Sequence, residues 1–351
     1  MLLTRSGKPI PSAAIGGMKW TSNLYGTVDI QKSTETLEKA LQEGFFHIDT
    51  ADCYLGSNGN LDSEAFIGAV LKKKFACTKT TREEIFIASK CGIKLNPTQA
   101  WCREVDISPE YIITACEASL NRLKTPYLDL FYLHRINEAI NTIEESMQAI
   151  SVLLDSGKIR YVGLSEANTD IILRADYQLR QLTSGKHGIS AIQTEYNFLH
   201  RGPENDGVFC LCHKQDISFF AYSPLCRGLA TDVPIVFSEH DCRKKLERFQ
   251  GTYLVHNQKV MEKVRNLAQR NGYSLAQLAI AWFTAQTKIF NILAYPIFGT
   301  ANPRHLHENI IALKIKLDTN LLSDINYLIP FGVGKGLRYP DLDFKEFKLT
   351  S

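Results

Sequence analysis

The chain has no apolar run of membrane-spanning length, and its first residues contain no apolar stretch long enough for a secretory signal. It also lacks an excess of one charge, because 40 basic and 37 acidic residues are well mixed over 351 positions and leave a net charge of +3. Such a balanced surface creates no strong field toward nucleic acid or membrane. We therefore expect a cytoplasmic protein, a monomer or small homo-oligomer, whose partner is a small molecule.

The cysteines lack the dense, paired spacing of small secreted domains. Nine of them, an odd number, are scattered along the chain, which favours reduced thiols. Cys210 and Cys212 are separated by one residue, unlike common zinc pairs, and no second pair follows at a suitable distance. The sequence therefore predicts no metal site.

Signs of a domain boundary are missing as well, since the chain has no Ser/Gly-rich linker, low-complexity tract or block of charge. The early glycine fingerprint of open dinucleotide-binding sheets is also absent. A chain of this length with 44% hydrophobic residues is able to bury one large core. We expect a single domain over residues 1–351.

Short β-branched or aromatic runs alternate with longer segments of helical period, which is typical of repeated β–α units around a parallel sheet. The expected strands are Ala14 to Gly16, Phe45 to Asp49, Ile85 to Ser89, Leu128 to His134, Ile159 to Ser165, Ile189 to Thr194, Ile217 to Ser223 and Ile292 to Ile297. The expected helices are Lys32 to Glu43, Asp62 to Lys73, Pro109 to Lys124, Asn141 to Ser156, Thr169 to Arg180, Asp206 to Lys214, Asn257 to Arg270 and Ser274 to Gln286. This α/β pattern favours a (β/α)8 TIM barrel, and an open doubly wound sheet is the alternative.

Three stretches do not fit the repeat and are expected to be long loops or tails: residues 91–108, 226–256 and 331–351. Loops of this length are more often functional than idle. The first two follow strand ends, and the third follows the last repeat. In a (β/α)8 barrel we expect all three to lie over the face where active sites form.

Four polar side chains end or follow three of the expected strands: Asp49, Tyr54, Lys90 and His134. Such positions face one mouth of a barrel. A free phenol has a pKa of about 10, and we expect the ammonium group of Lys90 to lower the pKa of Tyr54. Asp49 would hold Lys90 protonated, while His134 would donate a hydrogen bond to a substrate oxygen. Each residue alone has a simpler structural explanation, but the four together favour a catalytic site.

The sequence resembles the aldo-keto reductases over nearly its whole length, and in particular the aldose dehydrogenase and pyridoxal reductase-like members. The motifs that carry the resemblance are HIDTADCY, ASKCG, LDLFYLHR, GKIRYVGLSEAN, QTEYN, AYSPLCRGLATD and PIFGTANPRHLHENI. The resemblance implies a (β/α)8 enzyme that transfers hydride between a nicotinamide cofactor and an aldehyde, ketone or sugar.

Carried over by position, the resemblance implies that Tyr54 is the general acid and base. Lys90 and Asp49 would tune it, and His134 would orient the substrate oxygen. For the cofactor, it implies contacts to the carboxamide, the nicotinamide ring and the phosphates from Ser165, Gln193, Tyr222, Ser223, Leu225, Gly228, Gly299, Thr300, Arg304, His305 and Asn309. Ser165 and Gln193 would hold the carboxamide, and Tyr222 would stack under the ring.

Two departures from the family pattern bear on the cofactor. Glu166 stands where many members have Asn, and an ionised carboxylate only accepts hydrogen bonds. In Gly299 to Asn309, which we call the phosphate segment because the resemblance implies phosphate contacts there, the residue with a permanent positive charge is Arg304. NADP(H) is the leading cofactor, because an arginine fork suits a 2′-phosphate, and NAD(H) is the alternative.

Other functions stay open from sequence alone. The family resemblance also allows a nicotinamide-binding regulatory subunit with little turnover of its own. A barrel hydrolase is a weaker alternative, because it would need a second pair of carboxylates at strand ends. Substrate selection is expected near the mouth, from Trp20, Tyr25 or Trp101.

Overall fold

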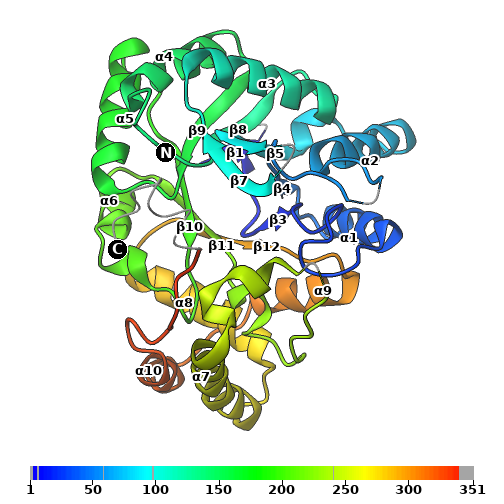
Figure 1. Ribbon diagram of the computed structural model, residues 1–351, viewed down its shortest axis with the longest axis vertical. Helices are drawn as coiled ribbons and strands as arrows, with labels where there is room; N and C mark the ends of the chain where they lie inside the picture. The colour runs from blue at the N-terminus through cyan, green and yellow to red at the C-terminus, as the bar shows by residue number, and fades with distance from the viewer. Residues whose placement is uncertain (1–2, 6–7, 58, 97–98, 240, 340–351) are drawn as a thin grey trace.

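Eight parallel strands close into a barrel at the centre of the computed structural model, which describes residues 3–5, 8–57, 59–96, 99–239 and 241–339 (Figure 1). Around the barrel the strands are β3 (Ala14–Gly16), β4 (His47–Asp49), β5 (Phe86–Cys91), β8 (Leu128–Leu133), β9 (Ile159–Ser165), β10 (Ala191–Glu195), β11 (Ser218–Tyr222) and β12 (Ala294–Phe298). The predicted (β/α)8 barrel is confirmed, and the alternative of an open sheet is wrong.

Helices follow the strands and form the outer layer (Figure 1). They are α1 (Ile30–Gln42), α2 (Ser63–Cys77), α3 (Pro109–Leu123), α4 (Ile143–Asp155), α5 (Thr169–Leu182), α6 (Val208–Lys214), α7 (Gly251–Arg270), α8 (Leu275–Ile289), α9 (Pro303–Ala312) and α10 (Thr319–Leu328). Side-chain caps explain several of the starts. Ser108, Asn168 and Ser274 each accept a hydrogen bond from a backbone N–H of the first turn that has no partner within the helix.

The helix α10 is absent from the sequence prediction. Asp318 caps it by accepting a hydrogen bond from the N–H of Leu321, and its buried apolar side chains are Leu321 and Ile325, one turn apart. So narrow an apolar stripe gives a weak periodic signal, although the spacing of four residues is helical.

Two of the expected loops contain regular structure. Residues 91–108 include an antiparallel hairpin of β6 (Ile93–Asn96) and β7 (Gln99–Val105). Residues 226–256 include three short 3-10 turns, η3 (Cys226–Gly228), η4 (Cys242–Lys245) and η5 (Glu247–Phe249), and α7 starts at Gly251 rather than Asn257. The two segments are therefore folded additions to the barrel, not plain loops.

The interior of the barrel is packed with side chains. Phe86, Tyr132 and Phe220 point inward, and Leu3 and Ile10, which flank the hairpin of β1 (Thr4–Arg5) and β2 (Lys8–Pro9), join the same apolar cluster. This cluster fills the barrel on the side of the strands' amino ends, so an open cavity forms at their carboxyl ends. No helix of the described residues combines the length and apolar character needed to cross a bilayer.

After α10 the chain turns back toward the barrel, which Figure 1 shows as the red segment approaching β10 and β11. We call residues 330–339 the C-terminal strap. Two glycines allow close contact, since a Cβ on Gly334 would lie 2.2 Å from the carbonyl oxygen of Leu199, and one on Gly336 would lie 2.6 Å from Cα of Arg248. Asn257 holds the strap further through hydrogen bonds to the backbone N–H and C=O of Lys335.

Candidate active site

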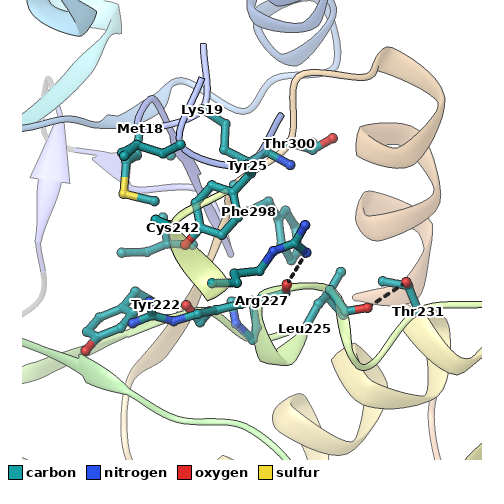
Figure 2. A pocket seen from close by; sticks show the side chains of 18 of the residues that line it. Met18, Lys19, Tyr25, Tyr222, Leu225, Arg227, Thr231, Cys242, Phe298 and Thr300 are labelled. Carbon is teal, nitrogen blue, oxygen red and sulfur yellow. Dashed lines mark hydrogen bonds between the residues drawn. The ribbon is translucent and has the colours of Figure 1, made fainter. Parts of the chain in front are cut away.

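A cavity of about 660 Å³ opens at the carboxyl ends of the strands, a size typical of small-molecule sites. Figure 2 shows Lys19 and Tyr25, from the segment after β3, facing Arg227 from the turn after β11. The backbone N–H of Cys242 donates to the carbonyl of Leu24, which joins the two segments on one side of the cavity. The residues after β3 and β11 therefore make walls of a single site.

At the base of the cavity, Lys90 and Asp49 form a buried ion pair. The Lys90 ammonium lies 2.6 Å from Oδ1 of Asp49 and also donates to the carbonyl of Thr50 at 2.7 Å. The other carboxylate oxygen of Asp49 accepts a hydrogen bond of 2.8 Å from Nε2 of Gln193. Both oxygens of the carboxylate are thus satisfied, which a buried charge requires.

Tyr54 and His134 lie next to this pair. The Lys90 ammonium lies 5.1 Å from the centre of the Tyr54 ring, and the Tyr54 and His134 rings meet edge to face with centroids 5.7 Å apart. Sγ of Cys53 lies 3.5 Å from Nδ1 of His134. The structure therefore brings an acid, a cation, a phenol and an imidazole together at one end of the barrel.

The expectation that Lys90 lowers the pKa of Tyr54 is wrong. Burial raises the pKa of Tyr54 well above its usual value, and the negative charge of Asp49 adds to the rise. The ammonium of Lys90 is already paired with Asp49, so its field on the phenol is largely cancelled. Tyr54 consequently stays a neutral phenol, with its proton in place, at neutral pH.

Of the eleven residues expected to contact the cofactor, ten line the cavity: Ser165, Gln193, Tyr222, Ser223, Leu225, Gly228, Gly299, Thr300, His305 and Asn309. Arg304 does not. It is exposed on the first turn of α9 and lies outside the set of cavity-lining residues. From the same helix, His305, Glu308 and Asn309 do line the cavity.

The aromatic residues proposed for substrate selection differ in position. Tyr25 lines the cavity. Trp20 is fully buried, and its indole N–H donates to the carbonyl of Thr300 at 2.9 Å, so it packs and braces the phosphate segment instead of facing substrate. The side chain of Trp101 lies outside the described residues.

Glu166 accepts hydrogen bonds from three parts of the chain. Oε1 accepts from the Tyr222 hydroxyl at 2.7 Å and from the backbone N–H of Glu195 at 3.0 Å. Arg338 of the strap binds both oxygens, at 3.0 and 2.6 Å. Burial opposes the charge of Glu166, but Arg338, with help from Arg135 and Tyr222, outweighs it and lowers the pKa of Glu166 to about 2. Glu166 is therefore an ionised anchor, with its acceptor positions already used.

Arg135, Arg227 and Tyr339 are among the cavity-lining residues that sequence reasoning missed. Arg135 donates to the Tyr339 hydroxyl at 3.0 Å and to Oγ of Ser165 at 3.4 Å. Nε of Arg227 is buried with no hydrogen-bond partner among the described residues. Arg135 could have been predicted, because it directly follows His134 in the motif LHR. Tyr339 lies far from every motif, so nothing in the sequence indicated that it lines the cavity.

The cavity wall is rich in positive charge near Tyr25. Lys19, Arg227 and Arg243 all line this part. Burial, and then the positive charge of Arg243, lower the pKa of Lys19. Arg243 is itself paired with Asp241 at 2.6 Å. The positive side chains near Tyr25 favour an anionic ligand.

In the part of the chain that the structure describes, no group of three or more His, Cys, Asp or Glu side chains is placed to hold a metal ion.

Comparison with known proteins agrees with this arrangement. The model of the Aldo/keto reductase family matches residues 14–329. Similar sequences include probable aldo-keto reductase 1 of Glycine max, 32% identical over 99% of this chain and 94% of that protein. Aldo-keto reductase yakc of Schizosaccharomyces pombe, whose name specifies NADP(+), is 32% identical over 94% of this chain and 92% of that protein.

Two solved structures share the fold. The glycerol dehydrogenase AKR11B4 of Gluconobacter oxydans superposes with a TM-score of 0.74 at 22% identity, covering 95% of this chain and 97% of that one. The thermostable aldo-keto reductase Tm1743 superposes with a TM-score of 0.66 at 27% identity, covering 93% and 98%. The family model and the relatives of 32% identity show that the chain is an oxidoreductase of the aldo/keto reductase family.

Proposed function

We propose that this protein binds NADP(H) and interconverts the carbonyl group of a small aldehyde or an aldose sugar with the corresponding alcohol. The observation that carries the proposal is the cluster of Asp49, Tyr54, Lys90 and His134 beside the cavity. When bound, the nicotinamide cofactor supplies or accepts the hydride. The side chains of the protein then have to move one proton and stabilise one developing charge.

Tyr54 is the proton donor in reduction. Because burial keeps its phenol protonated, a proton is available for the carbonyl oxygen over the whole neutral range. The phenolate left behind would lie near the ammonium of Lys90, 5.1 Å from the ring centre in the resting site. His134, at the edge of the same ring, donates a hydrogen bond that holds the substrate oxygen in line.

Asp49 links the proton donor to the cofactor site. Through Oδ1 it orients Lys90, and through Oδ2 it accepts from Nε2 of Gln193. The remaining oxygen of the Gln193 amide is then the acceptor for a carboxamide N–H, while Ser165 adds a hydroxyl. Tyr222 offers the flat ring face on which a nicotinamide stacks.

The other end of the cavity fits phosphate groups. The first turn of α9 supplies backbone N–H groups and the positive end of its dipole. Arg227, with its unpaired Nε, and Lys19 add positively charged donors from the segments after β11 and β3. Since Arg304 lies outside the cavity, His305 and these two cations are the better candidates for a 2′-phosphate. These positive side chains support NADP(H) over NAD(H), as does the NADP(+) in the name of the Schizosaccharomyces pombe relative.

The test is turnover. Oxidation of NADPH is followed by its absorbance with a panel of small aldehydes, aldoses and pyridoxal, and NADH is run in parallel. We expect turnover with at least one class and tighter binding of NADPH than of NADH. Tight binding of NADPH without turnover on any compound would contradict the proposal and favour a nicotinamide-binding regulatory subunit.

A further inference from the structure

The carboxylate of Glu166 joins the strap to the end of the barrel strands. It is 3% exposed, and Arg338 holds it with two hydrogen bonds although the two residues are 172 positions apart. The same oxygen that binds Arg338 at 3.0 Å also accepts from the hydroxyl of Tyr222. A change at Arg338 therefore reaches the ring of Tyr222 through one shared atom.

Tyr339, the next residue of the strap, contacts Tyr222 directly. Their hydroxyl groups lie 2.7 Å apart, and the Tyr339 hydroxyl also accepts from Arg135 at 3.0 Å. Arg135 in turn reaches Oγ of Ser165 at 3.4 Å. The strap thus touches the hydroxyl of the proposed stacking residue from two sides, and through Arg135 it is linked to one of the proposed carboxamide ligands.

The strap is held in this position by contacts away from the cavity. The N–H of Leu337 donates to Glu247 at 2.6 Å, and Gly336 lies against the backbone of Arg248 with φ +83°, where a side chain would be strained and would clash. Nε2 of His256 lies 2.9 Å from the carbonyl oxygen of Val333. These bonds fix the direction in which Arg338 and Tyr339 enter the site.

We propose that Arg338 and Tyr339 are positioning residues of the cofactor site, which orient Tyr222 and neutralise Glu166 beside the nicotinamide. The inference rests on the proposed function, because it assigns the strap to the same nicotinamide site. In this site Glu166 does not contact the carboxamide; it anchors the strap. The strap thereby becomes part of a cofactor site that otherwise consists of barrel residues.

If Arg338 and Glu166 act on the cofactor through their charges, replacing them should change the relative affinity for the oxidised and reduced cofactor. A merely structural role would not change it. The oxidised nicotinamide ring is a cation and the reduced ring is neutral. Removing the charge of Arg338 leaves the Glu166 carboxylate uncompensated near the ring, which favours the oxidised form. Removing the charge of Glu166 leaves Arg338 uncompensated and favours the reduced form. The ratio of the dissociation constants for NADP+ and NADPH therefore shifts in opposite directions in the two variants.

The experiment compares Arg338→Gln, Glu166→Gln and the double variant by measuring NADPH and NADP+ binding through cofactor fluorescence and protein fluorescence. We expect NADPH to bind roughly tenfold more weakly to Arg338→Gln. The ratio should shift by roughly fivefold in opposite directions in the two single variants. The double variant, with its charges balanced again, should return toward the wild-type ratio. Arg338→Lys keeps the charge and should keep the ratio while losing the two-bond geometry.

Glu204→Gln is the matched control. Glu204 is 8% exposed and also takes two hydrogen bonds from an arginine, Arg201, and one from a tyrosine hydroxyl, that of Tyr196, yet none of the three lines the cavity. This variant should lose thermal stability and keep the wild-type affinity for both cofactor forms.

Unchanged binding and an unchanged ratio in the two strap-site variants, with a wild type that binds NADPH and turns over, would overturn the strap role and leave the proposed function intact. A loss of NADPH affinity in Glu204→Gln equal to that in Arg338→Gln would also overturn it, since loss of stability alone would then explain the effect. A wild type that binds neither NADPH nor NADH would overturn both.

Discussion

The protein contains two groups built from the same three side-chain types, a glutamate, an arginine and a tyrosine. At the barrel mouth Glu166 binds Arg338 and the Tyr222 hydroxyl. In the outer wall Glu204 binds Arg201 through two bonds of 2.8 Å and the Tyr196 hydroxyl through one of 2.6 Å. The chemistry of the two groups is nearly identical, so their difference lies in what surrounds them.

The wall group closes locally and faces the core. Arg201 and Tyr196 lie three and eight residues from Glu204, and the Tyr196 ring stacks on Trp282 with centroids 5.3 Å apart. The bonds among these three side chains lie beneath packed aromatic rings, and Nη1 of Arg201 also donates to Oδ1 of Asn326 and to the carbonyl of Ile329. This group therefore stabilises the attachment of the outer layer to β10, and its contribution is to the free energy of folding.

The mouth group closes over long separations and faces the cavity. Its partners come from 56 and 172 residues away, and Arg135, Arg227 and Tyr339 lie around it. Burial opposes ionisation of the Tyr339 phenol, but the charges of Arg135 and Arg227 outweigh burial, so the pKa of Tyr339 is lowered from its usual value. A cluster of charge held so close to an open cavity is typical of a binding site.

The largest effect is expected on turnover, and it should distinguish Tyr54 at the mouth from Tyr196 in the wall. Replacing Tyr54 by Phe removes the proton donor and should lower turnover by about 10²–10⁴-fold while leaving the unfolding free energy nearly unchanged. Replacing Tyr196 by Phe removes a hydrogen bond to Glu204 and should cost about 1–3 kcal/mol of stability with turnover unchanged. Steady-state kinetics and urea unfolding check the pair. A similar loss of turnover in both variants would remove the distinction between mouth and wall.

The next effect concerns the buried ion pair of the mouth. Replacing Lys90 by Met leaves the Asp49 carboxylate without its cation and should cost about 3–5 kcal/mol of stability as well as activity. The double variant Asp49→Asn with Lys90→Met removes both charges and should recover most of the stability without recovering turnover. If the double variant were as unstable as the single one, the pair would be structural in the same sense as the wall group.

A smaller, pH-dependent effect is expected from Asp52, which lies between the mouth and the outer helices. Its carboxylate accepts from the hydroxyl of Tyr111 at 3.3 Å, and burial, together with Glu64, raises the pKa of Asp52 to about 7. The folded protein therefore holds a proton that the unfolded chain releases near pH 4. The contribution of protonated Asp52 to the unfolding free energy is therefore present at low pH and is lost as pH rises through about 7.

Between pH 5 and 9 the wild type should accordingly lose roughly 2–3 kcal/mol of unfolding free energy through this group. Asp52→Asn has no such proton to lose, so its unfolding free energy should change less between pH 5 and pH 9. Compared with the wild type, the variant should be more stable at pH 9 than at pH 5. Chemical unfolding of both proteins at the two pH values measures the difference. Parallel profiles for the wild type and the variant would show that Asp52 titrates normally.

Much of the fold was predictable because its signals are local. Each barrel strand is a short apolar run, and Asp49 and Lys90 lie at or next to the ends of two of these strands. The (β/α)8 pattern therefore predicted that the two side chains meet at the carboxyl end of the barrel. The hairpin of β6 and β7 was missed because it interrupts the repeat, and the helix α10 was missed because it follows the repeat and buries only two apolar side chains, Leu321 and Ile325.

The rest of the site depends on tertiary contacts. Glu166 was recognised as a departure from the family pattern, yet its partner Arg338 lies in a segment that sequence alone presents as a tail. Arg304 was chosen for its charge, but it is exposed and is not among the cavity-lining residues, whereas Arg227, which was not chosen, lines the cavity. The pKa of Tyr54 rises because the phenol is buried and lies near Asp49, and burial is not visible in a motif.

The most direct test of the account is a crystal structure of the protein with NADP+ bound. We predict the nicotinamide ring against Tyr222, its carboxamide at Ser165 and Gln193, and its reactive edge toward Tyr54. The strap should stay in place, with Arg338 still bound to Glu166. A nicotinamide ring bound outside this cavity, or seated within it after displacing the strap from Glu166, would contradict the account.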